Sequence, residues 1–258
     1  MHIVDQLINE IPFFPQRRVA AGRLGLSPLH KCTGAIRMLE YGCAADVVDK
    51  YLRIGETTSM KCMQHFVDSI ILFFGDEYLR KPTAEDLQKL FIIGEIRGFP
   101  GMMGSIDCMH WECKNCPTAW KCQYTRASGK PTIVLEAVAS QDLWIWHAFF
   151  GLPCTLNDIN ILDRFPVFND IFKERAPKYK YVVNGNQYSL GYYLTDGIYP
   201  KWATFIQSIS SLFATQQEAC RKDVVRAFGV LQARFAIVKN PTLIWDKERI
   251  GKIMRACI

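Results

Sequence analysis

The stretch Met102–Trp111 reads M-M-G-S-I-D-C-M-H-W, a mostly apolar run with one carboxylate, Asp107, near its middle. This pattern predicts a buried β-strand, in which an unpaired carboxylate is costly to bury. Two more runs rich in β-branched and aromatic residues follow, P-T-I-V-L-E-A-V-A-S from residue 131 and L-W-I-W-H-A-F-F-G from residue 143. Turn residues separate the runs, so we expect three consecutive strands.

A helix, a strand and a second helix are expected after these three strands. Residues 157–172 have a helical pattern, Y-Y-L-T-D-G-I-Y-P at residues 192–200 predicts a fourth strand, and Gln216–Val238 predicts a long helix. This order indicates a mixed α/β fold in which helices flank a mixed sheet. It is compatible with a ribonuclease-H-like core.

The first third of the chain predicts helices. Ser27 and Pro28 form a cap and first-turn pair for a helix around Leu29–Tyr41. Residues 42–74 have the pattern of a helix-turn-helix with Gly55 in the turn. Such a motif would place Lys61 in a DNA groove, and a three-helix packing unit without a ligand is the alternative.

The glycines and prolines near residue 98 predict a domain boundary. Pro82-Thr83 with Glu85-Asp86 starts a further helix that ends near Gly94–Gly98. Because Pro100-Gly101 follows at once, we expect an all-helical region at residues 1–97 and a second domain at residues 98–258.

The net charge and its distribution along the chain indicate which part of the protein is expected to bind anionic partners. The net charge is +6; residues 1–100 hold 12 basic and 12 acidic residues, so the excess lies in residues 101–258. Attraction to phosphate is therefore expected from the C-terminal part.

No apolar run approaches the roughly 20 residues that span a bilayer, and no secretory signal is recognisable, so we expect a soluble intracellular protein. The ten cysteines are expected to be reduced thiols, and their spacing does not favour a zinc site.

Three aspartates are candidate metal ligands. Asp107 and Asp196 are expected at neighbouring strand ends, where carboxylates can converge on Mg²⁺ or Mn²⁺ and support phosphodiester cleavage. Asp158 lies at the entry to the predicted helix at residues 157–172, where a metal ligand and a helix cap are equally good explanations.

Four long runs closely resemble plant PIF/Harbinger-type transposases: G-S-I-D-C-M-H-W-E-C-K-N-C-P-T-A-W, L-E-A-V-A-S-Q-D-L-W-I-W-H-A-F-F-G, Y-Y-L-T-D-G-I-Y-P-K-W and R-K-D-V-V-R-A-F-G-V-L-Q-A-R-F. The likeness covers nearly the whole chain. It implies a DDE nuclease of ribonuclease-H-like fold with an N-terminal helix-turn-helix region. It further implies divalent metal, DNA as substrate, a nuclear location and a Myb-like DNA-binding partner protein; without that partner a cytoplasmic location is left open, as is a homo-oligomer.

The resemblance also assigns the acidic residues. Asp107 and Asp196 match the first two catalytic aspartates, and Asp158 matches a further acidic position. The third catalytic residue of the family is a glutamate in K-D-V-E-R-A-F-G, where this chain has Val225. The family would also place the cations Arg221, Lys222 and Arg226 beside DNA phosphates.

Neighbouring acids are not expected to replace the missing glutamate. Asp223 lies about 200° around the helix from position 225, and Glu218 lies about 10.5 Å along its axis. We expect Val225 to pack instead on an apolar stripe with Phe228, Leu231 and Phe235. A loop at residues 209–214 is shorter than in relatives, and the chain ends at G-K-I-M-R-A-C-I, where relatives continue; this end indicates a C-terminally truncated domain or an exposed helix edge. Both departures favour a decayed or repurposed copy.

Two functions are consistent with these features. The first is a metal-dependent endonuclease derived from a transposase and impaired by Val225, because losing one ligand cripples a two-metal site. The second is a non-catalytic nuclear protein that keeps the fold to bind DNA or a chromatin protein. The acid missing at position 225 distinguishes them.

Overall fold

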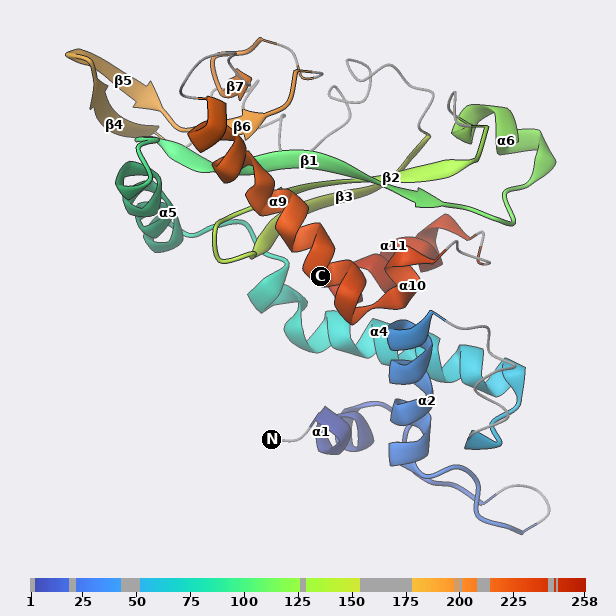
Figure 1. The fold of residues 1–258 in the computed structure, drawn as a ribbon. Coiled ribbons are helices and arrows are strands. Elements are labelled where there is room, and N and C mark those ends of the chain that lie inside the picture. The colour runs from blue at the N-terminus through green and yellow to red at the C-terminus, as the bar shows by residue number, and fades with distance from the viewer. Residues whose placement is uncertain are drawn as a thin grey trace. The chain divides into compact units, whose positions relative to one another are not determined.

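The computed structural model describes residues 3–18, 22–42, 52–125, 129–153, 178–197, 199, 201–207, 214–240, 244 and 246–258 (Figure 1). The chain divides into two compact units. The helical unit comprises residues 1–78, 113–115 and 231–258, and the sheet unit comprises residues 79–112 and 116–230. The mixed α/β class and the N-terminal helical region are therefore confirmed. The predicted boundary at residue 97 stays a prediction.

The helical unit contains α1 (Ile3–Glu10), α2 (Pro28–Tyr41), α4 (Glu56–Tyr78), α10 (Ala236–Lys239) and α11 (Lys247–Cys257). Ser27 caps α2, as predicted, because its side chain accepts a hydrogen bond from the backbone N–H of His30. The second helix of the expected helix-turn-helix is present as α4. The first would fall largely on residues 43–51, which lie outside the described residues.

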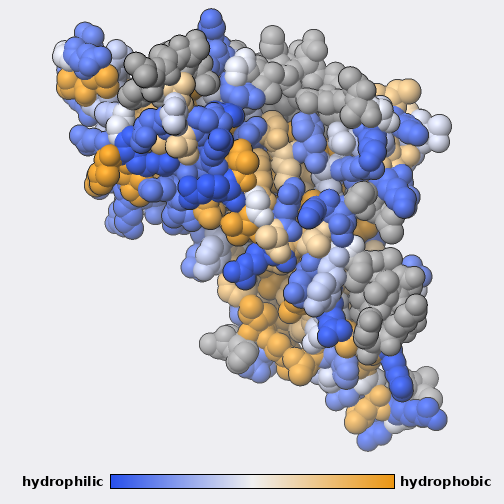
Figure 2. All heavy atoms as spheres, in the orientation of Figure 1, coloured by the Kyte–Doolittle hydropathy of each residue, from blue (hydrophilic) through white to orange (hydrophobic). Residues whose placement is uncertain are grey.

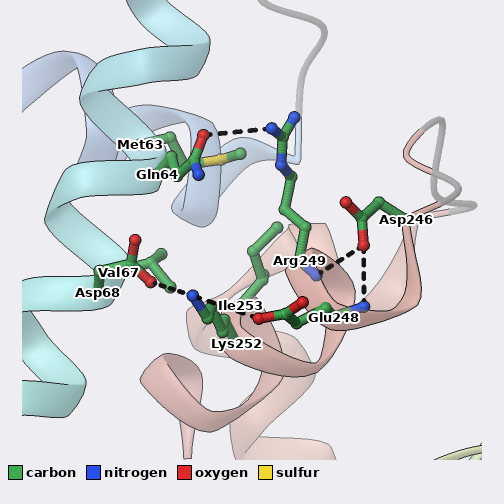
Figure 3. A pocket seen from close by; sticks show the side chains of 9 residues that line it. All are labelled: Met63, Gln64, Val67, Asp68, Asp246, Glu248, Arg249, Lys252 and Ile253. Carbon is green, nitrogen blue, oxygen red and sulfur yellow. Dashed lines mark hydrogen bonds and ion pairs between the residues drawn. The ribbon is translucent and has the colours of Figure 1, made fainter.

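Polar contacts join α11 to α4 (Figure 3). Lys252 Nζ lies 3.0 Å from Asp68 Oδ1, and Arg249 Nη2 donates to Gln64 Oε1 at 3.2 Å. Asp246 caps α11 by accepting from the backbone N–H groups of Glu248 and Arg249. The small cleft between these helices is therefore a packing contact within the helical unit.

The sheet unit is built on five strands: β1 (Met102–Glu112), β2 (Thr132–Ala139), β3 (Ile145–Pro153), β6 (Tyr192–Thr195) and β7 (Phe205–Gln207). Their order is β3-β2-β1-β6-β7. The strands β1, β2 and β3 pair antiparallel, whereas β6 is parallel to β1 and β7 is parallel to β6. The four predicted strands are confirmed, and the three-residue β7 was not foreseen.

Helices cover both faces of this sheet (Figure 1). The helix α5 (Ala84–Ile96) packs through Phe91 on Met103 and Ile106, while α9 (Ala214–Arg234) packs through Cys220 on Met102 and Leu194. An irregularity in β1 between Met102 and Gly104 changes which face the side chains point to. Thr83 and Asp86 form the capping box of α5, as their positions predicted.

One expectation is wrong, and one hairpin was not predicted. The predicted helix Gln216–Val238 is not continuous: α9 ends at Arg234, Phe235 is extended at φ −128° and ψ 91°, and α10 follows. The hairpin of β4 (Lys178–Val183) and β5 (Asn186–Leu190) was missed, although its turn is Asn184-Gly185 with φ of 51° and 79°. Asn-Gly is the strongest short hairpin signal. The predicted helix at 157–172 lies outside the described residues.

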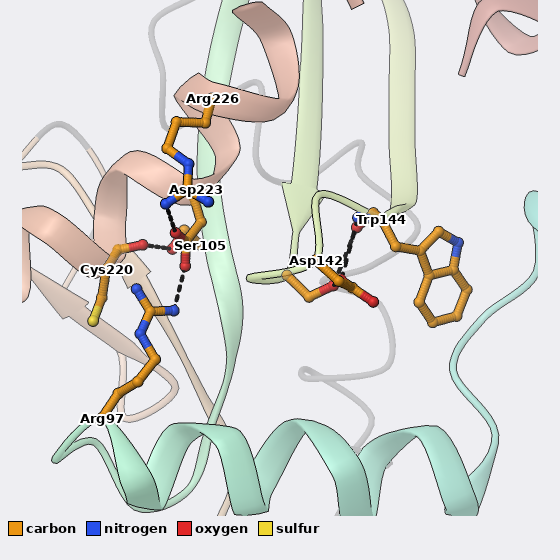
Figure 4. Close-up of polar contacts among 8 residues, drawn as sticks. Arg97, Ser105, Asp142, Trp144, Cys220, Asp223 and Arg226 are labelled. Carbon is orange, nitrogen blue, oxygen red and sulfur yellow. Dashed lines mark hydrogen bonds and ion pairs between the residues drawn. The ribbon is translucent and has the colours of Figure 1, made fainter. Parts of the chain in front are cut away.

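An ion pair links α5 to α9 (Figure 4). Arg97 at the end of α5 donates to Asp223 Oδ2, and the Asp223 side chain is only 1% exposed. Arg226 reaches Asp223 Oδ1 at 3.3 Å from a side chain that is 56% exposed. A buried carboxylate depends on its buried partner much more than on a solvated one.

This difference gives the first prediction. Arg97→Ala is expected to lower the free energy of unfolding by about 3 kcal/mol, because it leaves Asp223 buried with only a solvated partner. Arg226→Ala, the matched control, is expected to cost less than about 1 kcal/mol. Urea unfolding followed by tryptophan fluorescence measures both, and equal losses would contradict the account.

A buried carboxyl group also lies on the α5 face of the sheet. Glu136 on β2 is 1% exposed, and its Oε1 accepts from Tyr199 Oη at 3.4 Å. Its Oε2 has no hydrogen-bond partner within the described part of the chain. Burial raises the pKa of Glu136 from 4.5 to about 8, against a smaller lowering by the Tyr199 hydroxyl. Glu136 is therefore protonated in the folded protein at neutral pH.

The second prediction concerns pH. The folded protein binds this proton more tightly than the unfolded chain, so stability falls as pH rises from about 4.5 to about 8, by up to roughly 5 kcal/mol. Glu136→Gln keeps the acceptor but cannot ionise, so its urea midpoint is expected to exceed that of the parent near pH 8 and to match it near pH 4.5. An unchanged pH profile in Glu136→Gln would refute this assignment.

Candidate functional site

Asp107 and Asp196 lie side by side on neighbouring strands. In the parallel β1–β6 pair Ser105 is opposite Leu194; Asp107 follows two residues later on β1, and Asp196 comes one residue after the end of β6. Side chains two residues apart on a strand share a face. Ser105 Oγ donates to Cys220 O of α9 at 2.8 Å, and Leu194 packs with Cys220 (Figure 4). Asp107 therefore projects towards the α9 side of the sheet, and the charges of both aspartates act on Arg221 of α9.

Arg221 is the cation at this edge. Its Nε and Nη2 donate to the two carboxylate oxygens of Glu218 at 2.9 and 3.0 Å. Its Nη1 lies 4.0 Å from Asp107 Oδ2. The hydrogen bond to Glu218 is the main cause that raises the pKa of Arg221, and the charges of Glu218, Asp107 and Asp196 add to it. One guanidinium group thus compensates three nearby carboxylates.

The ionisation of Asp107 is disfavoured. Its side chain is 23% exposed, and Oδ1 accepts from the backbone N–H of Cys108 at 2.7 Å. Burial is the main cause that raises its pKa; the Cys108 N–H and Arg221 lower the pKa, and the charges of Asp196 and Glu218 raise it. Additional positive charge near Asp107 would therefore favour its charged form.

The sequence did not predict that Glu218 lies close to Asp107. Its distance along the helix from position 225 had argued against it, but through Arg221 it lies in electrostatic contact with Asp107. The two residues come close because α9 crosses β1, and the spacing of residues along the helix does not predict this crossing. The structure describes no group of three His, Cys, Asp or Glu side chains arranged as metal ligands. Asp158 lies outside the described residues.

The expected packing of Val225 is wrong. Val225 is 44% exposed, whereas Val224, Ala227, Phe228 and Leu231 are buried. Position 225 follows Arg221 by one helical turn, so it lies on the face that carries Arg221 rather than on the buried stripe. Asp223 points away to Arg97, as expected from its angle on the helix. The position of the missing glutamate is therefore accessible to solvent and lies one helical turn from Arg221, which is 4.0 Å from Asp107.

The other cations expected at DNA are exposed. Lys222 is 58% exposed and lies 3.6 Å from Glu218, and Arg226 is 56% exposed. Hydrophilic residues predominate over the first turns of α9 in the view of Figure 2. Lys61 is exposed on α4 of the helical unit. Lys222 can meet a phosphate without breaking a buried contact, whereas Arg226 also pairs with the buried Asp223.

Comparison with known proteins gives one match. A family model described as plant transposon protein matches residues 76–258. The chain belongs to the plant transposon protein family. The matched part of this family member includes Asp107, Asp196 and all of α9. No curated protein and no solved structure matches.

Two further properties of this plant transposon protein are observed directly. None of its described helices is long and apolar enough to cross a membrane. The cysteines that the structure describes are free thiols, and they include Cys108, Cys113, Cys116 and Cys122.

The exposure of position 225 gives the third prediction. Val225→Glu is expected to change the free energy of unfolding by less than about 0.5 kcal/mol, because the new side chain is solvated and lies one turn from Arg221. Val224→Glu, one residue earlier and 0% exposed, is expected to cost at least about 3 kcal/mol because it buries a charge. Thermal unfolding of the two variants checks this, and a loss above about 2 kcal/mol for Val225→Glu would show a packed face.

Proposed function

We propose that this plant transposon protein derives from a PIF/Harbinger-type transposase and is a DDE endonuclease impaired by Val225. The observation that carries the proposal is the parallel pairing of β1 with β6 together with the electrostatic proximity of Asp107, Asp196 and Arg221, which lies one helical turn before position 225. A sheet with three antiparallel strands, two parallel strands and a covering helix supports a ribonuclease-H-like core.

The residues fit a divalent cation in part. Asp107 and Asp196 offer hard oxygen ligands on one face, and the raised pKa of Asp107 is the electrostatic condition that a cation relieves. Asp107 and Asp196 would hold Mg²⁺ or Mn²⁺, with Asp158 as a further ligand. A bound metal would activate water and stabilise charge on a phosphodiester.

Arg221 and position 225 explain why catalysis would be weak. Valine supplies no oxygen ligand, so the acidic set has lost one member. Arg221 already compensates Asp107 and Glu218, and a cation must displace part of this interaction before it binds. The site therefore keeps its folded arrangement without metal and binds metal poorly.

The exposed cations support DNA as the partner. Lys222 and Arg226 lie on α9 close to the acidic edge and would contact backbone phosphates on either side of the scissile bond. Lys61 of α4 would add a contact from the helical unit. A nuclear location and a Myb-like partner protein follow from the same proposal.

A non-catalytic DNA- or chromatin-protein-binding module is the second candidate. The compensation of the carboxylates by Arg221 favours it, since the arrangement needs no metal to be stable. The two candidates differ in whether an acid at position 225 restores cleavage.

The fourth prediction separates them by nicking of supercoiled plasmid with Mn²⁺. The parent chain is expected to cut near background, and Val225→Glu to cut at least about tenfold faster, because even outer-shell partners of a metal contribute 10–100-fold. Val225→Glu/Asp107→Asn is expected to return to background. Val230→Glu is the matched control, because Val230 is an equally exposed valine on another face of α9.

Other outcomes decide against parts of the proposal. If the parent chain cuts efficiently and Asp107→Asn abolishes cutting, another group completes the metal site and Val225 causes no impairment. If Val225→Glu cuts no faster than Val230→Glu, the restored-acid account is wrong and the binding module is favoured.

A further inference from the structure

The sheet unit contains a cavity between the β4–β5 hairpin and the loop after α5. It has a volume of about 310 Å³, at the small end of the range of ligand pockets. Its nine lining residues carry no charged side chain, and three of them are tyrosines. They are Gly98, Phe99, Pro100, Tyr181, Val183, Tyr188, Tyr192, Ile206 and Gln217.

Two of these tyrosines, Tyr181 and Tyr188, belong to a column of nearly parallel rings. Phe91 and Tyr179 stack with centroids 4.0 Å apart, Tyr179 and Tyr181 follow at 6.3 Å, and Tyr181 and Tyr188 at 5.5 Å. The interplanar angles are 13°, 22° and 17°. The column starts at Phe91, which is 3% exposed, and ends at Tyr188, which is 47% exposed. It therefore presents an accessible aromatic ring supported by a buried stack.

The rings are held in place before any ligand arrives. Tyr181 Oη donates to Leu190 O at 3.1 Å. The Tyr181 ring covers Gly101 so closely that a Cβ there would lie 2.4 Å from it. Gly101 O in turn accepts from the N–H of Tyr192, whose ring lies 6.2 Å from that of Tyr181. Little conformational freedom remains to be lost when a planar ligand stacks on this surface.

The surrounding charge favours an anionic ligand. Residues 178–190 include Lys178 and Lys180 and no acidic residue. Figure 2 shows hydrophilic and hydrophobic residues side by side at the hairpin, at the upper left. Burial raises the pKa of Tyr181 and of Tyr192, so both hydroxyl groups stay protonated at neutral pH. A stacked aromatic surface on a hairpin whose charged residues are all basic has the features that bind single-stranded nucleic acid.

From these observations we infer that the tyrosine cavity binds an unpaired base of single-stranded DNA, with the base stacked on the exposed ring of Tyr188 at the end of the column. In duplex DNA the bases are stacked inside the double helix, so no base is available to bind in the cavity. The inference shares with the proposed function the premise that the chain binds DNA, but it uses none of the acidic residues.

The test measures affinity for a fluorescein-labelled oligothymidine and for a duplex of matched length, with the full chain in EDTA. Tyr188→Leu is expected to weaken single-strand binding by at least about fivefold, the lower end of the effect of removing one stacked base. Tyr188→Phe keeps the ring and is expected to retain most of the affinity. Val182→Ala, exposed on the same hairpin, is the matched control. Duplex affinity is expected to stay within about twofold throughout.

A photocross-link gives an independent readout on the parent chain. An oligonucleotide containing 5-iodouracil is expected to cross-link to Tyr181 or Tyr188, as located by mass spectrometry of the peptides. Cross-links confined to other elements would overturn the inference, as would equal single-strand affinity in Tyr188→Leu and Val182→Ala. An equal loss of duplex affinity would also overturn it.

The proposed function can fail separately. Single-strand binding in EDTA that depends on Tyr188 but not on Asp107→Asn supports the cavity whether or not Val225→Glu nicks plasmid. If the chain binds neither single-stranded nor duplex DNA, both the proposed base binding in the cavity and the proposed nuclease function are wrong.

Discussion

The parallel pairing of β1 with β6 is the constraint on which the sheet unit depends. It joins an antiparallel three-stranded layer to a strand that comes much later in the chain, and it brings Asp107 into electrostatic contact with Asp196. Two contacts fix α9 over this pair: Ser105 with the carbonyl of Cys220, and Arg97 with Asp223. The same contacts decide which helix residues meet the acidic edge.

Local patterns predicted the elements well where one signal dominates. The Ser27-Pro28 cap, the Thr83–Asp86 capping box and the apolar run at Met102–Trp111 each appear where expected. The break at Phe235 carries no glycine or proline and could not be read from composition. The hairpin at Asn184-Gly185 was readable, and its turn signal was overlooked between tyrosine-rich flanks.

The candidate site was predictable in its strands and not in its helix. Asp107 is on β1 and Asp196 directly follows β6, so the pairing of these two strands brings the aspartates to one edge. The rotation of α9 about its axis depends on which side chains the sheet accepts, and this placed Val224 inside and Val225 in solvent. Arg221 and Glu218 follow from that rotation. An internal guanidinium beside Asp107 then supplies positive charge at the place where the resemblance implies a metal ion.

The central claim is that Asp107 and Asp196 form one cation site whose missing ligand is at position 225. Anomalous scattering from Mn²⁺-soaked crystals of Val225→Glu tests it most directly. The account predicts an ion within about 2.5 Å of oxygens of both aspartates and of the introduced carboxylate, with Arg221 moved off Asp107. An ion bound elsewhere, or Arg221 still paired with Asp107 and no ion between the aspartates, would contradict it.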